Sequence, residues 1–399
     1  MGRYVNPGNE AFARILRGDY VDKTGLVALF DESLHTLDNL VCVSRPRRFG
    51  KTLAAEALAA YYSCGCDSRS LFDGLKISRS PLFEQHLNAF NVVRLDMTDI
   101  VHRAGAAIES EVTALVVTEL REELSSIPEG TRLSDALWAA ARLTGRKFVF
   151  IVDEWDAIFR VRPDDIEAQR AYVDFLRSLF KNASLTADVF AGAYLTGILP
   201  IRKYGTQSAL NDFREYTMVS PDRFAPYVGF TEADVEGLAA RYSMDVAQLR
   251  GWYDGYELPA VGAVFAPSSL MEACKSGRVG SYWARTETFE SLRAYIDIDL
   301  DGLQDTVARL VAGSDEPVNT LGFQNDLRSI SSADDVLTLL VHLGYLAYDD
   351  ATRAARIPNE EVRGEFRNAL EESRHPKVAR IVRESDQLMR SVLAGDAAA

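Results

Sequence analysis

The stretch "VSRPRRFGKT", residues 43–52, decides how the first half of this chain is interpreted. It ends in Gly-Lys-Thr, as phosphate-binding loops do, but Arg45 stands where such a loop ordinarily has its first glycine. In such a loop Gly50 allows close backbone approach, Lys51 reaches the terminal phosphates and Thr52 places its hydroxyl on Mg²⁺. The alternative is a solvated basic turn, because Gly-Lys-Thr by itself is a common combination.

The surrounding residues favour the phosphate loop. "NLVCVS", residues 39–44, predicts a buried strand before it, and "LAAEALAAYYS", residues 53–63, predicts a helix after it. Further on, "KFVFIVDEWD", residues 147–156, predicts a strongly apolar strand that ends in two acids. Asp153 is the expected Mg²⁺ ligand, and Glu154 the expected group that orients or deprotonates an attacking water. The competing interpretation is that both acids only cap the end of a strand.

Three more strands are predicted: "NVVRLDM" at residues 91–97, "VFAGAYLTG" at residues 189–197 and "EYTMVS" at residues 215–220. Helix-like segments separate most of the strands, which predicts a parallel sheet covered by helices and a first domain over residues 1–220. The α/β fold class expected is that of P-loop nucleoside triphosphatases with a strand inserted between the loop and the acidic strand.

Thr196 ends the strand that follows the acidic strand, where such proteins often carry a polar residue that senses the γ-phosphate. The alternative is a strand-end threonine without special function. Arg202 or Lys203 would add positive charge nearby.

Composition describes an ordinary globular protein of 399 residues, 47% hydrophobic and 26% charged. Its net charge of -14 argues against coating nucleic acid or an anionic membrane through its overall field. No window approaches the run of about 18 apolar residues that a membrane span needs. Cys64 and Cys66 are the only clustered cysteines, which favours reduced thiols over a zinc site. We therefore expect a cytoplasmic protein.

The second half of the sequence has a different pattern of predicted secondary structure. Residues 221–330 predict short amphipathic helices without evident strands, forming a helical domain. Residues 331–370 predict a helix and two strand-like segments, "GYLAYD" and "RAARIP", which resemble a winged helix. Residues 371–399 are predicted to begin as a helical tail and to end in disorder.

Several motifs together resemble the bacterial and archaeal family of AAA-ATPase-like proteins, over roughly residues 4–370. In chain order they are "YVDKT" (20–24), "SRPRRFGKT" (44–52), "FIVDEWDA" (150–157), "LTGILPI" (195–201), "GFTEADV" (229–235), "WYDGY" (252–256) and "IPNEEVRGEF" (357–366). In that family an arginine in place of the first glycine is the usual form of the loop. The resemblance implies a P-loop ATPase core that binds ATP and Mg²⁺.

The resemblance also implies positions for the site. The phosphate loop would consist of Arg45, Pro46, Arg47, Arg48, Phe49, Gly50, Lys51 and Thr52. The metal ligands would be Thr52 and Asp153, and the catalytic groups Glu154, Lys51 and Thr196. It places Asp22, Lys23 and Thr24 near the nucleotide, although the same residues also suit the cap of a helix at "LVALF".

Two departures from the family limit what can be transferred. Ala266 stands before the proline in "FAPSS", where members usually carry asparagine. No nuclease signature is found after residue 371, although many members continue into a restriction-like nuclease domain. "WYDGY" is expected to be an aromatic packing cluster with Gly255 at a turn.

The function expected is an ATP-binding, Mg²⁺-dependent ATPase whose nucleotide state moves its C-terminal helical and winged parts. The alternative is a nucleotide-gated interaction module with negligible turnover that partners a nuclease or another effector. A protein effector or self-association is the expected partner. Nucleic acid is a weaker candidate, because the segment around "RAARIPNEEVRGEF" balances its arginines with glutamates.

Overall fold

The computed structural model describes residues 2–181, 183–201, 203, 204, 207, 208, 210–259, 261–282, 292, 293, 295–297, 300–324 and 329–371. The chain divides into two compact units, Met1–Val228 and Gly229–Ala399. Arg202 and the predicted tail beyond residue 371 lie outside the described residues, as does the side chain of Lys203.

The first unit is built on a five-stranded parallel sheet in the order β2-β3-β4-β1-β7. The strands are β1 (Leu40–Ser44), β2 (Asn91–Asp96), β3 (Phe148–Asp153), β4 (Phe190–Gly197) and β7 (Arg214–Tyr216). β1, β3 and β4 are buried along their whole length, as central strands covered on both faces are. The predicted α/β fold class is confirmed, although the last strand is shorter than predicted and begins earlier.

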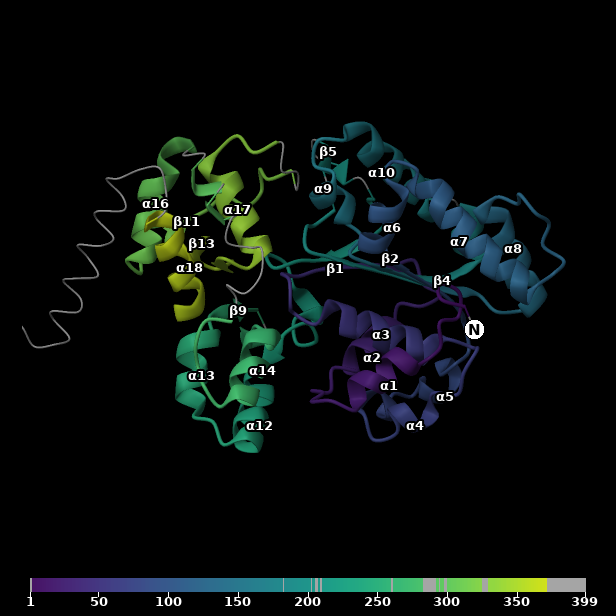
Figure 1. Cartoon of the computed structure of the whole chain (residues 1–399), viewed down its shortest axis with the longest axis horizontal. Helices are drawn as coiled ribbons and strands as arrows, with labels where there is room; N and C mark the ends of the chain where they lie inside the picture. The colour runs from purple at the N-terminus through teal and green to yellow at the C-terminus, as the bar shows by residue number, and fades with distance from the viewer. Residues whose placement is uncertain are drawn as a thin grey trace, which may run out of the picture. The chain divides into compact units, whose positions relative to one another are not determined.

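Helices cover both faces of this sheet (Figure 1). One face carries α1 (Glu10–Leu16), α2 (Gly25–Asp31), α3 (Lys51–Tyr62), α4 (Arg69–Phe72) and α5 (Phe83–His86). The other carries α6 (Met97–Ala104), α7 (Ile108–Glu123), α8 (Leu133–Thr144), α9 (Ala157–Val161) and α10 (Ile166–Phe180). Short elements complete the unit: α11 (Ala183–Asp188), the 3₁₀ turns η1 (Lys76–Arg79) and η2 (Asp222–Phe224), and the hairpin β5 (Lys203–Tyr204) and β6 (Gln207–Ser208).

The N-terminal segment protects the outer edge of β2. Val5 forms an antiparallel bridge with Val93, and Asn6 exchanges two hydrogen bonds of 2.8 Å with the backbone of Val92. The carboxylate of Glu119 on α7 accepts from three successive backbone N–H groups at the start of this segment. An edge covered in this way cannot pair with another chain.

The second unit contains two small antiparallel sheets and six helices among its described residues. One sheet has the order β8 (Phe230–Thr231), β10 (Gly262–Phe265), β9 (Tyr256–Leu258), and the other β11 (Glu316–Pro317), β13 (Ala354–Arg356), β12 (Ala347–Asp349). The helices are α12 (Glu232–Tyr242), α13 (Val246–Tyr253), α14 (Pro267–Ser276), α16 (Leu303–Val311), α17 (Ala333–Leu343) and α18 (Glu360–Glu371), with the 3₁₀ turn η4 (Leu300–Gly302) before α16. The sequence predicted only helices for residues 221–330, whereas four of these strands lie there. They are two to four residues long, too short to show an alternating pattern.

The "WYDGY" motif packs against the start of α18. Gly255 has φ of 114°, and a Cβ there would lie 1.9 Å from the carbonyl oxygen of Pro358. Asn359 Nδ2 donates to the carbonyl oxygen of Asp254 at 2.9 Å. Only glycine permits this approach of two backbones, so two separated sequence motifs form a single packing contact.

Candidate nucleotide-binding site

The predicted site residues meet at one edge of the parallel sheet. β1 ends at Ser44, directly before the loop, β3 ends at Asp153 and β4 ends at Gly197. β4 lies between β3 and β1, and Thr196 pairs in register with Val43. In parallel sheets covered by helices, ligands bind at this carboxyl edge.

Gly50 turns the chain from the loop into α3. Its φ of 88° and ψ of 14° are left-handed, and α3 begins at Lys51. Nothing lies within 4 Å of a Cβ built on Gly50, so conformation and not space requires glycine here. The twelve-residue helix that follows has the free N–H groups and positive dipole end that suit a phosphate.

Lys51 lies inside the site, with its side chain only 4% exposed. Its Nζ donates to the carbonyl oxygen of Pro46 at 2.9 Å and lies 3.7 Å from Glu154 Oε1. Burial lowers the pKa of Lys51, and the negative charges of Glu154, Asp156 and Asp153 oppose that shift. The lysine is thus held between the loop and the acidic end of β3.

Asp153 and Thr52 face each other across the site. Asp153 is 1% exposed, and its carboxylate is hydrogen-bonded to the Thr52 side chain and to the backbone N–H of Glu154. Burial raises the pKa of Asp153 to about 6, and the neighbouring charge of Glu154 adds to the rise. A carboxylate and a hydroxyl oxygen are hard ligands of the kind that Mg²⁺ takes, so this pair fits a magnesium ion.

Arg94 on β2 approaches the same acid. Its Nη2 lies 2.7 Å from Glu56 Oε1 and 3.8 Å from Asp153 Oδ2. The sequence did not single out Arg94, since an arginine inside a strand becomes part of a site only through pairing with the neighbouring strand. It partly offsets the negative charge at Asp153.

Glu154 follows Asp153 in a left-handed conformation, with φ of 52°. Its Oε2 accepts a hydrogen bond from Arg160 Nη2 on α9, and its Oε1 faces Lys51. Arg160 Nε in turn lies 3.3 Å from Asp156 Oδ2. The sequence showed Asp156 only as the last letter of "DEWD" and did not indicate Arg160.

Thr196 is fully buried in β4, and its hydroxyl has no hydrogen-bond partner among the described residues. Its carbonyl oxygen accepts from the backbone N–H of Trp155 at 2.9 Å, which joins the end of β4 to the acidic turn. A buried hydroxyl without a protein partner calls for a ligand or a water.

Arg45 points into the protein. It is 0% exposed, and its Nη1 donates to the carbonyl oxygens of Ser44 and Tyr216 at 2.9 and 3.1 Å. Its backbone N–H donates to Gly197 at 3.0 Å, so Arg45 joins β1 to β4 and β7. Burial lowers the pKa of Arg45 to about 10.

The rest of the loop divides into an inner and an outer part. Pro46 and Phe49 are buried, Arg48 is half-buried with φ of 69°, and Arg47 is exposed. Arg47 is therefore the loop arginine that is open to solvent.

The N-terminal "YVDKT" segment forms a capped turn. Asp22 Oδ1 accepts from the backbone N–H and the hydroxyl of Thr24, which precedes α2. Lys23 Nζ donates to the carbonyl oxygen of Pro226 at 2.8 Å. Thr24 is the N-cap residue of α2 but makes no side-chain capping hydrogen bond to that helix, and proximity to nucleotide stays a prediction.

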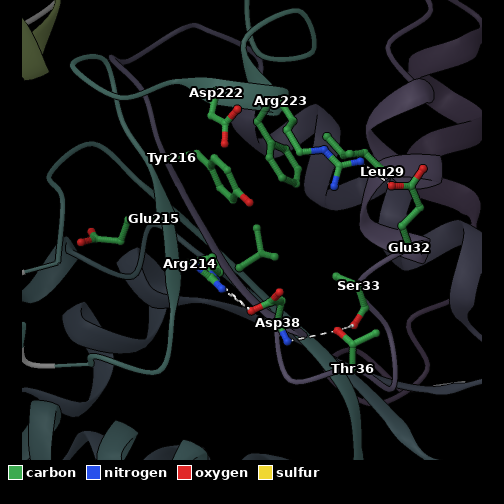
Figure 2. Close-up of a pocket in the computed structure, with 12 residues that line it drawn as sticks. Leu29, Glu32, Ser33, Thr36, Asp38, Arg214, Glu215, Tyr216, Asp222 and Arg223 are labelled. Atoms are coloured by element: carbon green, nitrogen blue, oxygen red, sulfur yellow. Dashed lines mark hydrogen bonds and ion pairs between the residues drawn. The ribbon is translucent and has the colours of Figure 1, made fainter.

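A cavity of about 380 Å³ lies elsewhere in the first unit, beside the edge strand β7 (Figure 2). Two ion pairs cross its lining, Arg214 with Asp38 at 2.7 Å and Arg223 with Glu32. It contains neither the loop nor the acids at the end of β3, so it is not the candidate nucleotide site.

The sheet order, the loop after β1 and the acids after β3 define a P-loop ATPase. The chain belongs to the AAA-ATPase-like family, because the family model described as "Predicted AAA-ATPase" matches residues 7–206. The predicted resemblance is thereby confirmed. Among the described residues, the helices are all too short or too polar to cross a membrane.

One relative is the "Uncharacterized protein in vnfD 5'region" of Azotobacter chroococcum mcd 1. It is 28% identical over 410 residues, which cover 98% of this chain and 74% of that protein. Its description assigns no activity.

Similar solved structures include the Aeropyrum pernix ORC2 protein in ADPNP-ADP complexes, at 12% identity, a TM-score of 0.37 and coverage of 88% of this chain and 95% of that one. The Aeropyrum pernix ORC1 protein in complex with DNA aligns at 14% identity and a TM-score of 0.29, over 96% of this chain and 100% of that one. Because these TM-scores lie below 0.5, neither the fold nor the site rests on them.

Proposed function

We propose that this protein binds ATP with Mg²⁺ and hydrolyses it to ADP and phosphate. The observation that carries the proposal is the meeting of four side chains at one sheet edge. Lys51 lies 3.7 Å from Glu154, and Thr52 is hydrogen-bonded to Asp153. In the sequence, Lys51 and Thr52 lie about a hundred residues before Asp153 and Glu154. Folding brings these four side chains together, and they are groups of the kind that phosphoryl transfer requires.

Each residue has a distinct role in the proposed reaction. The amides at the start of α3 and Lys51 bind the β- and γ-phosphates, and Arg47 contacts phosphate from the loop rim. Thr52 and Asp153 would hold a magnesium ion, which would supply positive charge to neutralise the phosphate oxygens. Glu154 accepts a proton from the attacking water, and Thr196 binds the γ-phosphate. Arg45, Pro46, Arg48 and Phe49 keep the loop in shape.

The proposed coupling is that nucleotide state changes the position of the second unit. The hairpin of β12 and β13 directly follows α17, which is the order of a winged helix. Residues Gly229–Ala399 also form one compact unit, which supports a body that moves as one piece. The proposed setting is the cytoplasm, where Cys42, Cys64, Cys66 and Cys274, none of which forms a disulfide, would stay reduced.

Two substitutions test the catalytic assignment. Glu154→Gln keeps the shape of the site but cannot take a proton, so it should abolish turnover while ATP binding remains. Lys51→Ala should weaken ATP binding itself. Binding is measured by calorimetry and hydrolysis by phosphate release. Parent-rate hydrolysis by Glu154→Gln, or undiminished binding by Lys51→Ala, would show that these residues do not form the site.

A second candidate is a nucleotide-gated interaction module with negligible turnover that binds a protein effector such as a nuclease, or a second copy of itself. The observation that favours it is the engagement of Glu154 by two cations, Lys51 and Arg160. Single-turnover hydrolysis with excess protein separates the two candidates, because a module that only switches leaves its ATP intact.

A further inference from the structure

Arg160 links the proposed catalytic acid to a second acid beside it. Its Nη2 donates to Glu154 Oε2, and its Nε lies 3.3 Å from Asp156 Oδ2. Arg160 and Glu154 are only 17% and 21% exposed, and Asp156 is fully buried. Charge-assisted bonds shielded in this way are stronger than ion pairs on an open surface.

Asp156 in turn holds the loop that follows β4. Its Oδ2 accepts from the backbone N–H groups of Ile198 and Leu199, at 3.2 and 3.0 Å. These residues come directly after Thr196 and Gly197 at the end of β4. Asp156 Oδ2 therefore contacts both Arg160 and this loop. If the loop moves, Asp156 moves with it, and the contact between Asp156 and Arg160 changes as well.

Lys51 is the second cation beside Glu154, and it is also the residue proposed to bind phosphate. Its Nζ donates to Pro46 and lies 3.7 Å from Glu154 Oε1. Phosphate entering the loop would draw Lys51 toward itself, because the lysine is the charged group that this loop offers to phosphate. Arg160 would then be the remaining restraint on Glu154.

We propose that Arg160 is a positioning residue, which holds Glu154 away from the attacking water. Nucleotide bound at Thr196 shifts the loop after β4, and Asp156 moves with that loop. Arg160 moves with Asp156 and thereby releases Glu154. This inference rests on the proposed ATPase function and adds its regulation. Once released, Glu154 takes a proton from water as the water oxygen bonds to the γ-phosphorus. The bond from that phosphorus to the bridging oxygen breaks, and its electron pair leaves with ADP.

The test is single-turnover ATP hydrolysis with Mg²⁺ by the full chain. In Arg160→Gln the restraint on Glu154 is weakened, so the rate should rise on the order of tenfold while ATP affinity stays unchanged. Arg160→Lys keeps a cation for Glu154 and should return the rate toward that of the parent. Arg162→Gln is the matched control. Arg162 lies two residues after Arg160 and forms a partly exposed ion pair with Asp165, so this change removes the same charge without touching Glu154.

A rate in Arg160→Gln that equals the parent rate or falls below it, with normal affinity, would overturn the inference. So would a rise that survives in the double variant Arg160→Gln/Glu154→Gln, since the gain must pass through Glu154. If Arg160→Gln does not fold, Asp156→Asn replaces it and should also raise the rate.

The inference and the proposed function fail in different ways. If the parent protein does not bind ATP, the proposed function is wrong. If the parent hydrolyses ATP and the Arg160 variants match it, only the role of Arg160 is wrong. If the parent binds ATP without hydrolysing it and Arg160→Gln does hydrolyse it, the restraint of Glu154 by Arg160 explains why the parent is inactive.

Discussion

Arg45 shows how one residue can replace the usual glycine of a phosphate loop. A glycine there would leave space beneath the loop, whereas Arg45 fills that space and donates to carbonyl oxygens of Ser44 and Tyr216. Its Nε and Nη2 have no partner among the described residues, and a buried guanidinium is costly unless its donors are satisfied. The arginine therefore braces β1 against β7 from inside, and a direct contact between Arg45 and phosphate stays a prediction.

The buried carboxylate of Asp153 is expected to lower the free energy of unfolding, although the proposed magnesium site requires it. Its pKa rises from 3.8 to about 6 on folding, so its ionised form is disfavoured in the native state. The penalty is absent below pH 3.8, grows between these two values and is complete above pH 6. A rise of this size in the pKa of Asp153 corresponds to about 3 kcal/mol, which already includes the opposing contributions of Thr52 and Arg94.

Asp153→Asn should therefore raise the free energy of unfolding above pH 7 by about 1–3 kcal/mol and abolish ATP turnover. Urea denaturation at pH 7.5 and at pH 4 without magnesium measures both limits. The gain should disappear at pH 4, and Asp174→Asn at an exposed acid should show no gain at either pH. A gain that is equal at both values would mean that charge burial is not its cause.

At the scale of elements, the long buried strands were predictable and the short ones were not. β1, β3 and β4 are continuous apolar runs bounded by polar residues, so their identity follows from composition alone. β8 and β11 are two residues long and exist only because a partner strand is present. Their hydrogen bonds depend on residues far away in the sequence, which local patterns do not report.

Gly255 gives a test at this scale, because it joins β9 to the start of α18. Gly255→Ala combines φ of 114° with a Cβ 1.9 Å from a backbone oxygen that cannot move aside alone. It should destabilise the second unit by on the order of 3 kcal/mol. Thermal unfolding and limited proteolysis report the loss.

The matched control is Gly251→Ala within α13, where nothing lies within 4 Å of a new Cβ. That change should be neutral or stabilise by about 0.5–1 kcal/mol, since alanine favours a helix interior. Equal stability of the two variants would refute the close contact between "WYDGY" and Pro358.

At the scale of the whole molecule, the charge distribution argues against nucleic acid as a partner. α17, the helix before the β12–β13 hairpin, carries Asp334 and Asp335 and has neither lysine nor arginine. The whole chain has a net charge of -14. A helix that enters a DNA groove needs cations for the phosphates beside it.

We therefore expect no DNA binding at micromolar protein, measured by fluorescence anisotropy with a duplex in 50 mM and in 200 mM salt, conditions between which phosphate contacts change affinity by roughly 10³-fold or more. Binding at low salt that falls steeply at high salt would contradict this and would revive α17 with the β12–β13 hairpin as a candidate DNA-binding element.

The sequence by itself determined the fold class, the loop over residues 45–52 and the acids Asp153 and Glu154, because each is a local pattern at the end of an apolar strand. Tertiary structure decided the direction of Arg45, the link from Glu154 through Arg160 and Asp156 to the β4 loop, and the contact of Gly255 with Pro358. The physical reason is that these contacts depend on strand order and on residues brought together by folding. A one-dimensional pattern shows which chemical groups are present, and packing alone determines which of them face one another.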